Sequence, residues 1–159
     1  MSQERPPESA RRTFIGQVLR MIRQARRLRT RDVGAAMGIG QRTYEYLEAG
    51  KTQATLERLR LFAAATGSDI NGIMAAYGIG SVAFGLRAAD NKLVTAFLIR
   101  LQEFDQDLGD DVAILDAASC IAAFDEAFQQ LTEEVRRRTA ARDALRKLNG
   151  EWREGDDES

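Results

Sequence analysis

Three adjacent polar side chains, Gln41, Arg42 and Thr43, follow a glycine turn and can make hydrogen bonds of defined geometry. An arginine can donate two parallel hydrogen bonds to O6 and N7 of guanine, and a glutamine amide can bond N6 and N7 of adenine. A threonine can pack on a thymine methyl group or bond to a phosphate. The triplet therefore has the hydrogen-bonding groups that contact with nucleic-acid bases and phosphates would need.

A short helix is the element that would carry these side chains. The segment Gly38-Ile39-Gly40 predicts a tight turn, and Gly50 predicts the end of the helix about three turns later. Tyr44 and Leu47 lie three residues apart and can share one buried stripe, so the polar triplet falls on other faces. A helix that enters the major groove of DNA needs this arrangement.

The rest of the chain offers little for catalysis. It has no histidine, the commonest general base and metal ligand, and its one cysteine is Cys120. The sequence has no nucleophile–base pair, no metal-ligand spacing and no complete phosphate-binding glycine loop. We therefore expect a protein that is not an enzyme and that needs no cofactor or metal.

Composition favours a folded protein of the cytoplasm. An apolar content of 44% suits a folded core. The sequence has no long uncharged apolar run and no signal-peptide core near its start, so we expect no membrane span and a cytoplasmic, nucleoid-associated location. Cys120 alone cannot form an internal disulfide, which agrees with a reducing compartment.

The near-neutral net charge of −1 hides a division along the chain. Residues 1–80 contain 13 basic and 7 acidic residues, a net charge of +6, whereas residues 81–159 contain 10 basic and 17 acidic residues, a net charge of −7. Such a division suits a polyanion-binding domain joined to a segment with another task. The alternative is that both halves are solvated helix surfaces.

Apolar periodicity and glycine positions divide the chain into five segments. Residues 1–12 are polar and contain two prolines, which predicts a disordered arm, and five short helices are predicted over residues 13–78. Glycines then predict a linker at 79–89, followed by a helical region at 90–149 and a loose acidic tail at 150–159. The first helix has an arginine-rich face, which favours phosphate contact; its members are Arg20, Arg23, Arg26 and Arg27.

The region 90–149 predicts a helix up to Leu108 and then a long helical stretch capped by Asp110-Asp111. Arg138 and Arg142 interrupt its heptad pattern, so this stretch could be two helices joined near residues 138–141. We expect an antiparallel helical hairpin that packs on a second copy, and the alternative is a self-contained bundle or an addition to residues 14–77. The seam residues predicted to form the dimer are Ile114, Ile121, Phe124, Phe128, Leu131 and Val135.

Residues 14–77 resemble the Cro/C1-type helix-turn-helix domain, also called the XRE family. The resemblance rests on the runs 33–39, 47–48 and 50–51 and on a further set of matching residues: Tyr44, Leu59, Phe62, Ala63, Gly67, Asp69 and Ile70. It implies an all-α, five-helix domain that binds double-stranded DNA, usually as a homodimer. The chain departs from the family pattern at Thr30, Gly34, Gly40 and Ala54.

The resemblance also implies which residues contact DNA. The start of the third helix would reach base edges, while the start of the second helix and the loop after Gly50 would lie on the backbone. Glu48 matches a glutamate with a structural role. The predicted DNA-contacting residues are Arg29, Thr30, Arg31, Gln41, Arg42, Thr43, Glu45, Tyr46, Lys51 and Thr52.

Two functions are compatible with these features. The first is a sequence-specific transcriptional regulator, expected to be a repressor, that binds an inverted repeat as a homodimer. The second is a protein-interaction protein of the same fold, such as an antitoxin or anti-activator, whose acidic C-terminal helices bind a protein partner.

Overall fold

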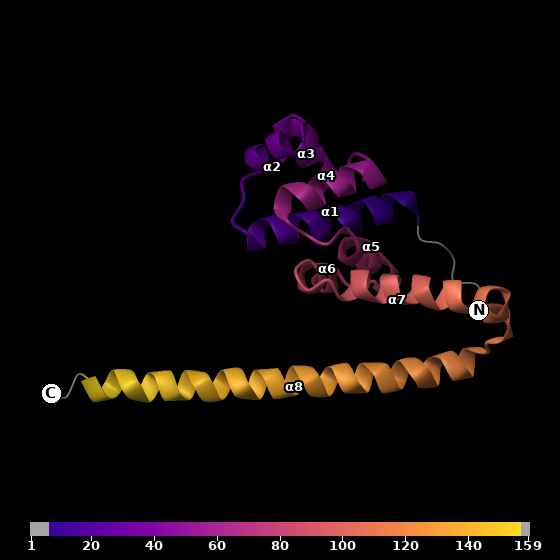
Figure 1. Cartoon of the computed structure of the whole chain (residues 1–159). Helices are drawn as coiled ribbons and strands as arrows, with labels where there is room; N and C mark the ends of the chain where they lie inside the picture. The colour runs from indigo at the N-terminus through magenta and orange to yellow at the C-terminus, as the bar shows by residue number, and fades with distance from the viewer. Residues whose placement is uncertain (1–6, 157–159) are drawn as a thin grey trace. The chain divides into compact units, whose positions relative to one another are not determined.

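The computed structural model describes residues 7–156, and within that range every regular element is a helix (Figure 1). The all-α prediction is confirmed. The elements are α1 (Glu8–Ala25), α2 (Thr30–Ala36), α3 (Gln41–Glu48), α4 (Leu56–Thr66), α5 (Ile70–Ile79), α6 (Val82–Ala88), α7 (Leu93–Leu108), the 3-10 helix η1 (Gly109–Ile114) and α8 (Ala117–Asp156).

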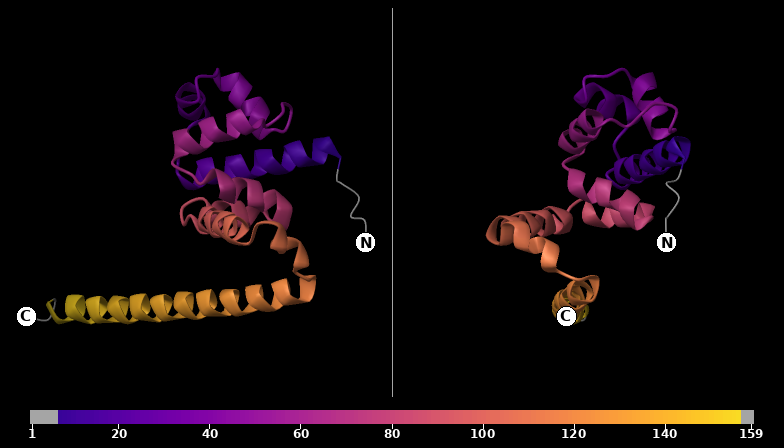
Figure 2. Two further views of the ribbon diagram at one scale, coloured as in Figure 1. Left: turned by 45° about the vertical axis from the view of Figure 1, so that its right-hand side comes forward. Right: turned by 90° about the vertical axis from the view of Figure 1, so that its right-hand side faces the viewer.

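Helix α1 is central to the N-terminal unit, which comprises residues 1–106. Figures 1 and 2 show α1 with α2, α3 and α4 on one side and with α5 and α6 on the other. Its residues Val18, Leu19 and Ile22 recur at helical spacing and are fully buried against Tyr44 and Phe62 from the helices that cover them. This burial fixes α3 relative to the core.

Local sequence explains where several of these helices begin and end. The side chains of Thr55 and Asp69 accept hydrogen bonds from Arg58 N and Asn71 N, so both are N-caps. Gly38 has a φ of +70° in the turn between α2 and α3, a conformation that residues with a Cβ rarely adopt. The turn before α3 therefore depends on a glycine at that position.

The predicted linker at 79–89 is wrong. Gly80 ends α5, and the Ser81 side chain accepts a hydrogen bond from Phe84 N to begin α6. Ala88 and Ala89 are buried, and Asp69 N donates to Ala89 O at 2.7 Å. A Cβ on Gly85 would lie 2.5 Å from Val18 Cγ1, so this glycine lets α6 pack closely on α1, and the segment is part of the N-terminal unit.

Helices extend into both of the predicted terminal segments. Helix α1 begins at Glu8, inside the predicted arm of 1–12, and Pro7 is its N-cap residue. Helix α8 continues to Asp156, inside the predicted tail of 150–159. The remaining parts of these two predictions, 1–6 and 157–159, lie outside the described residues.

The C-terminal unit, residues 107–159, contains one long helix. Asp116 caps α8 by accepting hydrogen bonds from Ser119 N and Ser119 Oγ, so the predicted cap at Asp110-Asp111 is wrong; those residues lie in η1. Helix α8 shows no break near residues 138–141. Ile114 lies in η1, so it does not share the helical seam of the other predicted dimer residues.

No helix among residues 7–156 is both long enough and apolar enough to cross a membrane.

Candidate nucleic-acid interface

Close packing of α1 against the end of α3 orients the helix that carries Gln41, Arg42 and Thr43. A Cβ built on Gly16 would lie 2.3 Å from Glu48 O and 2.9 Å from Leu47 O. Only a residue without a side chain lets the two backbones approach this closely. The inner residues Tyr44 and Leu47 are fully buried, as predicted, so α3 has one fixed face and one outer face.

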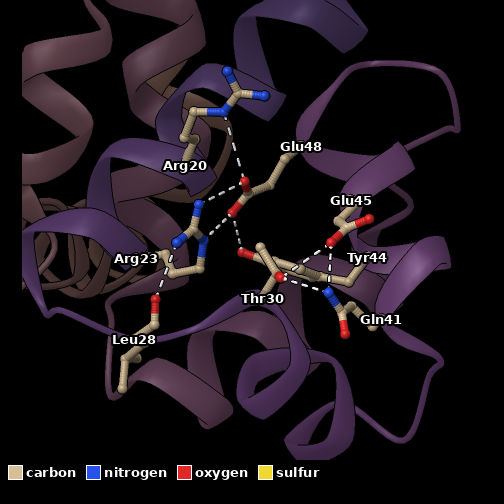
Figure 3. Close-up of polar contacts among 8 residues, drawn as sticks. All are labelled: Arg20, Arg23, Leu28, Thr30, Gln41, Tyr44, Glu45 and Glu48. Atoms are coloured by element: carbon tan, nitrogen blue, oxygen red, sulfur yellow. Dashed lines mark hydrogen bonds and ion pairs between the residues drawn. The ribbon is translucent and has the colours of Figure 1, made fainter.

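A buried ion pair holds the same junction (Figure 3). The Glu48 side chain is 3% exposed and accepts hydrogen bonds from Arg23 Nε at 2.6 Å, Arg23 Nη2 at 3.0 Å and Tyr44 Oη at 2.6 Å. Arg23 Nη1 also donates to Leu28 O, which ties the loop before α2 to this group. A buried carboxylate needs such partners because water no longer solvates it.

The electrostatics of this group agree with its geometry. The hydrogen bond to Glu48 raises the pKa of the Arg23 guanidinium. Burial raises the pKa of the Tyr44 hydroxyl far above its usual value, and its bond to the Glu48 carboxylate acts in the same direction. Tyr44 therefore remains a neutral donor at every physiological pH.

Two of the arginines expected on the phosphate-contacting face of α1 instead make contacts within the protein. Arg23 is paired with the buried Glu48, and Arg26 is paired with Asp90 at the exposed surface. Arg20 lies at the edge of the first pair, with its Nε 3.6 Å from Glu48 Oε2, and is half exposed. Helical spacing alone predicts one continuous basic face. In the fold, Arg23 and Arg26 instead pair with carboxylates of the protein, so the arginines do not act as one face.

The outer face of α3 carries a second polar network, which joins α3 to the start of α2 (Figure 3). Gln41 Nε2 donates to Glu45 Oε1 at 2.8 Å and to Thr30 Oγ1 at 3.3 Å, and Thr30 Oγ1 donates to Glu45 Oε1 at 3.2 Å. These bonds engage the amino group of Gln41 and leave its carbonyl oxygen as the group able to accept from a ligand.

A third group surrounds Tyr46, which is half-buried. Arg42 Nε donates to Tyr46 Oη at 2.9 Å, and both Arg42 and Lys51 place their charges over the Tyr46 ring, 5.5 and 5.3 Å from its centre. The bond through Nε leaves the two terminal nitrogens of Arg42 as its remaining donors. A fork of this kind matches the two acceptors on a guanine edge.

The start of α2 carries paired charges. Arg29 Nε and Arg31 Nε lie 2.8 and 3.2 Å from the two carboxylate oxygens of Asp32. The hydrogen bond from Arg29, with a smaller effect of Arg31, lowers the pKa of Asp32. Both arginines are exposed, so a phosphate could replace this carboxylate as their partner.

The ten predicted DNA-contacting residues therefore lie at the start of α2, including its N-cap residue Arg29, in α3 and in the loop that follows α3. Six are exposed and four, Thr30, Thr43, Tyr46 and Thr52, are half-buried. The Thr52 hydroxyl oxygen is itself buried and has no hydrogen-bond partner among the described residues. Sequence reasoning missed the bonds between these side chains, although the four-residue spacings of Gln41 with Glu45 and of Arg42 with Tyr46 could have indicated them.

The described residues include no group of three or more acidic, cysteine or histidine side chains placed to hold a metal ion.

Comparisons with known proteins identify the N-terminal part of the chain. Residues 15–74 match a protein family described as "Helix-turn-helix domain". This match confirms the helix-turn-helix resemblance of the sequence. No curated protein matches the chain. A similar solved structure is that of the clp gene regulator ClgR from C. glutamicum, with 20% identity, a TM-score of 0.42, and coverage of 47% of this chain and 94% of that one.

Proposed function

Because residues 15–74 are a helix-turn-helix domain, we propose that this chain is a sequence-specific transcriptional regulator that inserts α3 into the major groove of DNA. The observation that carries the proposal is the division of α3 into two faces. Its inner face is locked to α1 by the buried Glu48 pair, and its outer face presents Gln41 and Arg42 to solvent. A rigid helix with exposed polar side chains near its N-terminus suits base recognition.

Within the proposed complex, Arg42 contacts guanine through its two terminal nitrogens. Its Nε remains bonded to Tyr46, which reduces the rotamer freedom lost on binding. Gln41 accepts a hydrogen bond from a base amino group through its carbonyl oxygen, because Glu45 and Thr30 hold its amino group. Thr43 lies on the same helix and packs against a thymine methyl group or a phosphate.

Residues on both sides of α3 would hold the DNA backbone. Arg29 and Arg31 exchange the Asp32 carboxylate for phosphate oxygens. Lys51 approaches a phosphate from the loop after α3, with Tyr46 and Thr52 beside it. Each phosphate neutralised in this way releases counterions, so the binding constant falls steeply with salt.

The regulator is proposed to act as a homodimer on an inverted repeat and to repress where that repeat overlaps a promoter. Two copies of α3 would occupy half-sites about one helical turn apart. The apolar seam of α8 supports the second copy, because Ile121, Phe128 and Val135 are more than half exposed in the single chain.

The test is DNA binding by Arg42→Ala, measured by fluorescence anisotropy on an operator obtained by selection. Loss of one bidentate contact per half-site is expected to weaken binding by at least tenfold, since each contact contributes about 1–3 kcal/mol. Arg60→Ala is the matched control, because Arg60 is an exposed arginine of α4 outside the proposed surface, and it should bind within about twofold of the wild type. Equal affinities for the wild type and Arg42→Ala would remove α3 as the specificity element.

A further inference from the structure

Helix α8 exposes an apolar stripe along much of its length. Ile121, Phe128, Leu131, Val135 and Leu145 are separated by steps of three or four residues or by sums of such steps, and they are 47–63% exposed. Exposed apolar side chains at heptad spacing are typical of a helix that pairs with another helix.

Charges on α8 are segregated along its length. Residues 117–135 contain four acidic residues and no basic residue, residues 136–147 contain six basic residues and one acidic residue, and residues 148–156 contain one basic and three acidic residues. A parallel pair would place acid beside acid and base beside base. A full-length antiparallel pair would place the basic segment 136–147 of each helix beside the acidic residues of 126–135 of the other, which is favourable at the same contact distances.

We propose that α8 pairs in an antiparallel orientation with α8 of a second copy of this chain, along its whole length. In this register Phe128 faces Leu145 of the second copy, and Val135 faces Arg138 of the second copy. The inference rests on the homodimer of the proposed function and specifies its orientation and register.

The seam of this pair accommodates the two arginines that interrupt the heptads. Leu131 faces Arg142 of the second copy, so the interrupted half of each helix covers the apolar half of the other. The aliphatic part of an arginine can lie over an apolar side chain while its guanidinium group remains in water. Arg138 already directs its guanidinium to Glu134 of its own helix, at the edge of the seam.

One charged pair at the edge of the seam, Asp125 and Arg146, distinguishes this register from the alternatives. Asp125 and Arg146 are both exposed, and in the full-length antiparallel register each faces the other across the dimer, in two copies related by the two-fold axis. In a parallel pair Asp125 would lie beside Cys120 of the second copy. In an antiparallel pair that overlaps only the apolar halves, with Phe128 opposite Leu131, Asp125 would lie beside Thr132. Neither alternative gives Asp125 a basic neighbour at this edge.

The single native cysteine allows a direct test by pulsed electron paramagnetic resonance. Cys120 is partly exposed, so the full-length wild-type protein can be spin-labelled there without another substitution. With a rise of 1.5 Å per residue, the two labels lie about 50 Å apart in the proposed register, about 28 Å apart if only the apolar halves overlap, and less than about 20 Å apart in a parallel pair. A distance of about 50 Å supports the proposal, and either shorter distance overturns it.

A second label site checks the register independently. In the Cys120→Ser/Lys147→Cys variant, the proposed register predicts about 32 Å between labels, whereas overlap of the apolar halves predicts about 52 Å. Absence of any dipolar coupling in both labelled proteins would show a monomer and overturn both the orientation and the homodimer. Operator binding by the same samples then shows separately whether α3 binds DNA.

Charge reversal tests the edge pair by analytical ultracentrifugation. Asp125→Arg is expected to raise the dimer dissociation constant roughly tenfold, and Asp125→Arg/Arg146→Asp to restore it to within about twofold of the wild type. Glu126→Arg is the matched control, because Glu126 lies on the outer face of α8, and it should change the constant by no more than about threefold. Failure of the double reversal to restore the dimer would overturn the register.

Discussion

Helix α1 and helix α8 begin from the same kind of sequence pattern and reach different environments. Both repeat apolar residues at helical spacing, yet Val18 and Ile22 of α1 are fully buried, whereas Phe128 and Val135 of α8 are more than half exposed. The difference lies in what surrounds each stripe. Short helices, a glycine contact at Gly16 and a buried ion pair enclose α1, while α8 runs on for 40 residues. Periodicity identifies an apolar face, but only tertiary partners decide whether that face is covered within one chain.

The largest effect is expected from removing the buried carboxylate. Glu48→Ala would leave the partly buried Arg23 without its carboxylate partner and remove the acceptor of the buried Tyr44 hydroxyl, which should lower the free energy of unfolding by about 3–5 kcal/mol. All three tyrosines lie in residues 1–80, so urea unfolding followed by the tyrosine circular dichroism reports on this region. Glu133→Ala on the exposed side of α8 is the control. A loss below about 1 kcal/mol for Glu48→Ala would mean that the ion pair does not hold α3.

Truncating an apolar side chain on α8 should weaken dimer formation without changing the stability of the N-terminal unit. Phe128→Ala removes a large side chain from the proposed dimer seam, so the dimer dissociation constant should rise roughly thirtyfold. The tyrosine unfolding transition should not move. Gln129→Ala, one residue away, should leave both quantities unchanged. If Phe128→Ala altered the tyrosine transition as strongly as a core substitution, the contrast between α1 and α8 would be false.

A methyl group at the α1–α3 contact should also be costly. Gly16→Ala places a Cβ against the backbone of Glu48, and the resulting overpacking should destabilise the N-terminal unit by about 1–3 kcal/mol. Gly78→Ala in α5 meets no atom within 4 Å and should be neutral or stabilise by up to about 1 kcal/mol. Thermal unfolding of the two variants compares them directly. Equal melting temperatures would show that the two helices can separate without cost.

The smallest effect is a pH dependence that comes from Tyr44. Folding raises the pKa of the Tyr44 hydroxyl, whereas an exposed tyrosine in the unfolded chain has a pKa of about 10. Tyr44 therefore contributes its full stabilisation below about pH 10, and this stabilisation is lost as pH rises above that value. Unfolding free energy measured between pH 8 and about pH 11 should therefore fall at the alkaline end. The fall should be smaller in Tyr44→Phe. A fall of the same size in both proteins would assign it to other groups.

Much of the N-terminal unit could be predicted from sequence because local signals and packing agree there. Thr55 and Asp69 cap helices as their types predict, and Tyr44 and Leu47 are buried as their spacing predicts. Helix α6 was missed because the glycines at 79–89 were interpreted as a linker between domains. In the fold, Gly80 ends one helix and Gly85 is buried within the next.

The sequence predicts which faces of the helices carry the candidate-site residues, but not which other side chains the arginines contact. The exposed placement of Gln41 and Arg42 follows from helical spacing after a turn. The division of the α1 arginines does not, because the partners of Arg23 and Arg26 lie 25 and 64 residues away in sequence. Contacts of that range depend on how helices cross, which periodicity does not specify.

Selection of bound sequences from a random DNA library with the full chain shows whether α3 recognises DNA. We expect an enriched inverted repeat whose half-site centres lie about one helical turn apart, and loss of that enrichment when Gln41 and Arg42 are both replaced by alanine. Recovery of no enriched sequence, or of the same sequence by the double variant, would contradict the assignment of α3 as the helix that recognises DNA.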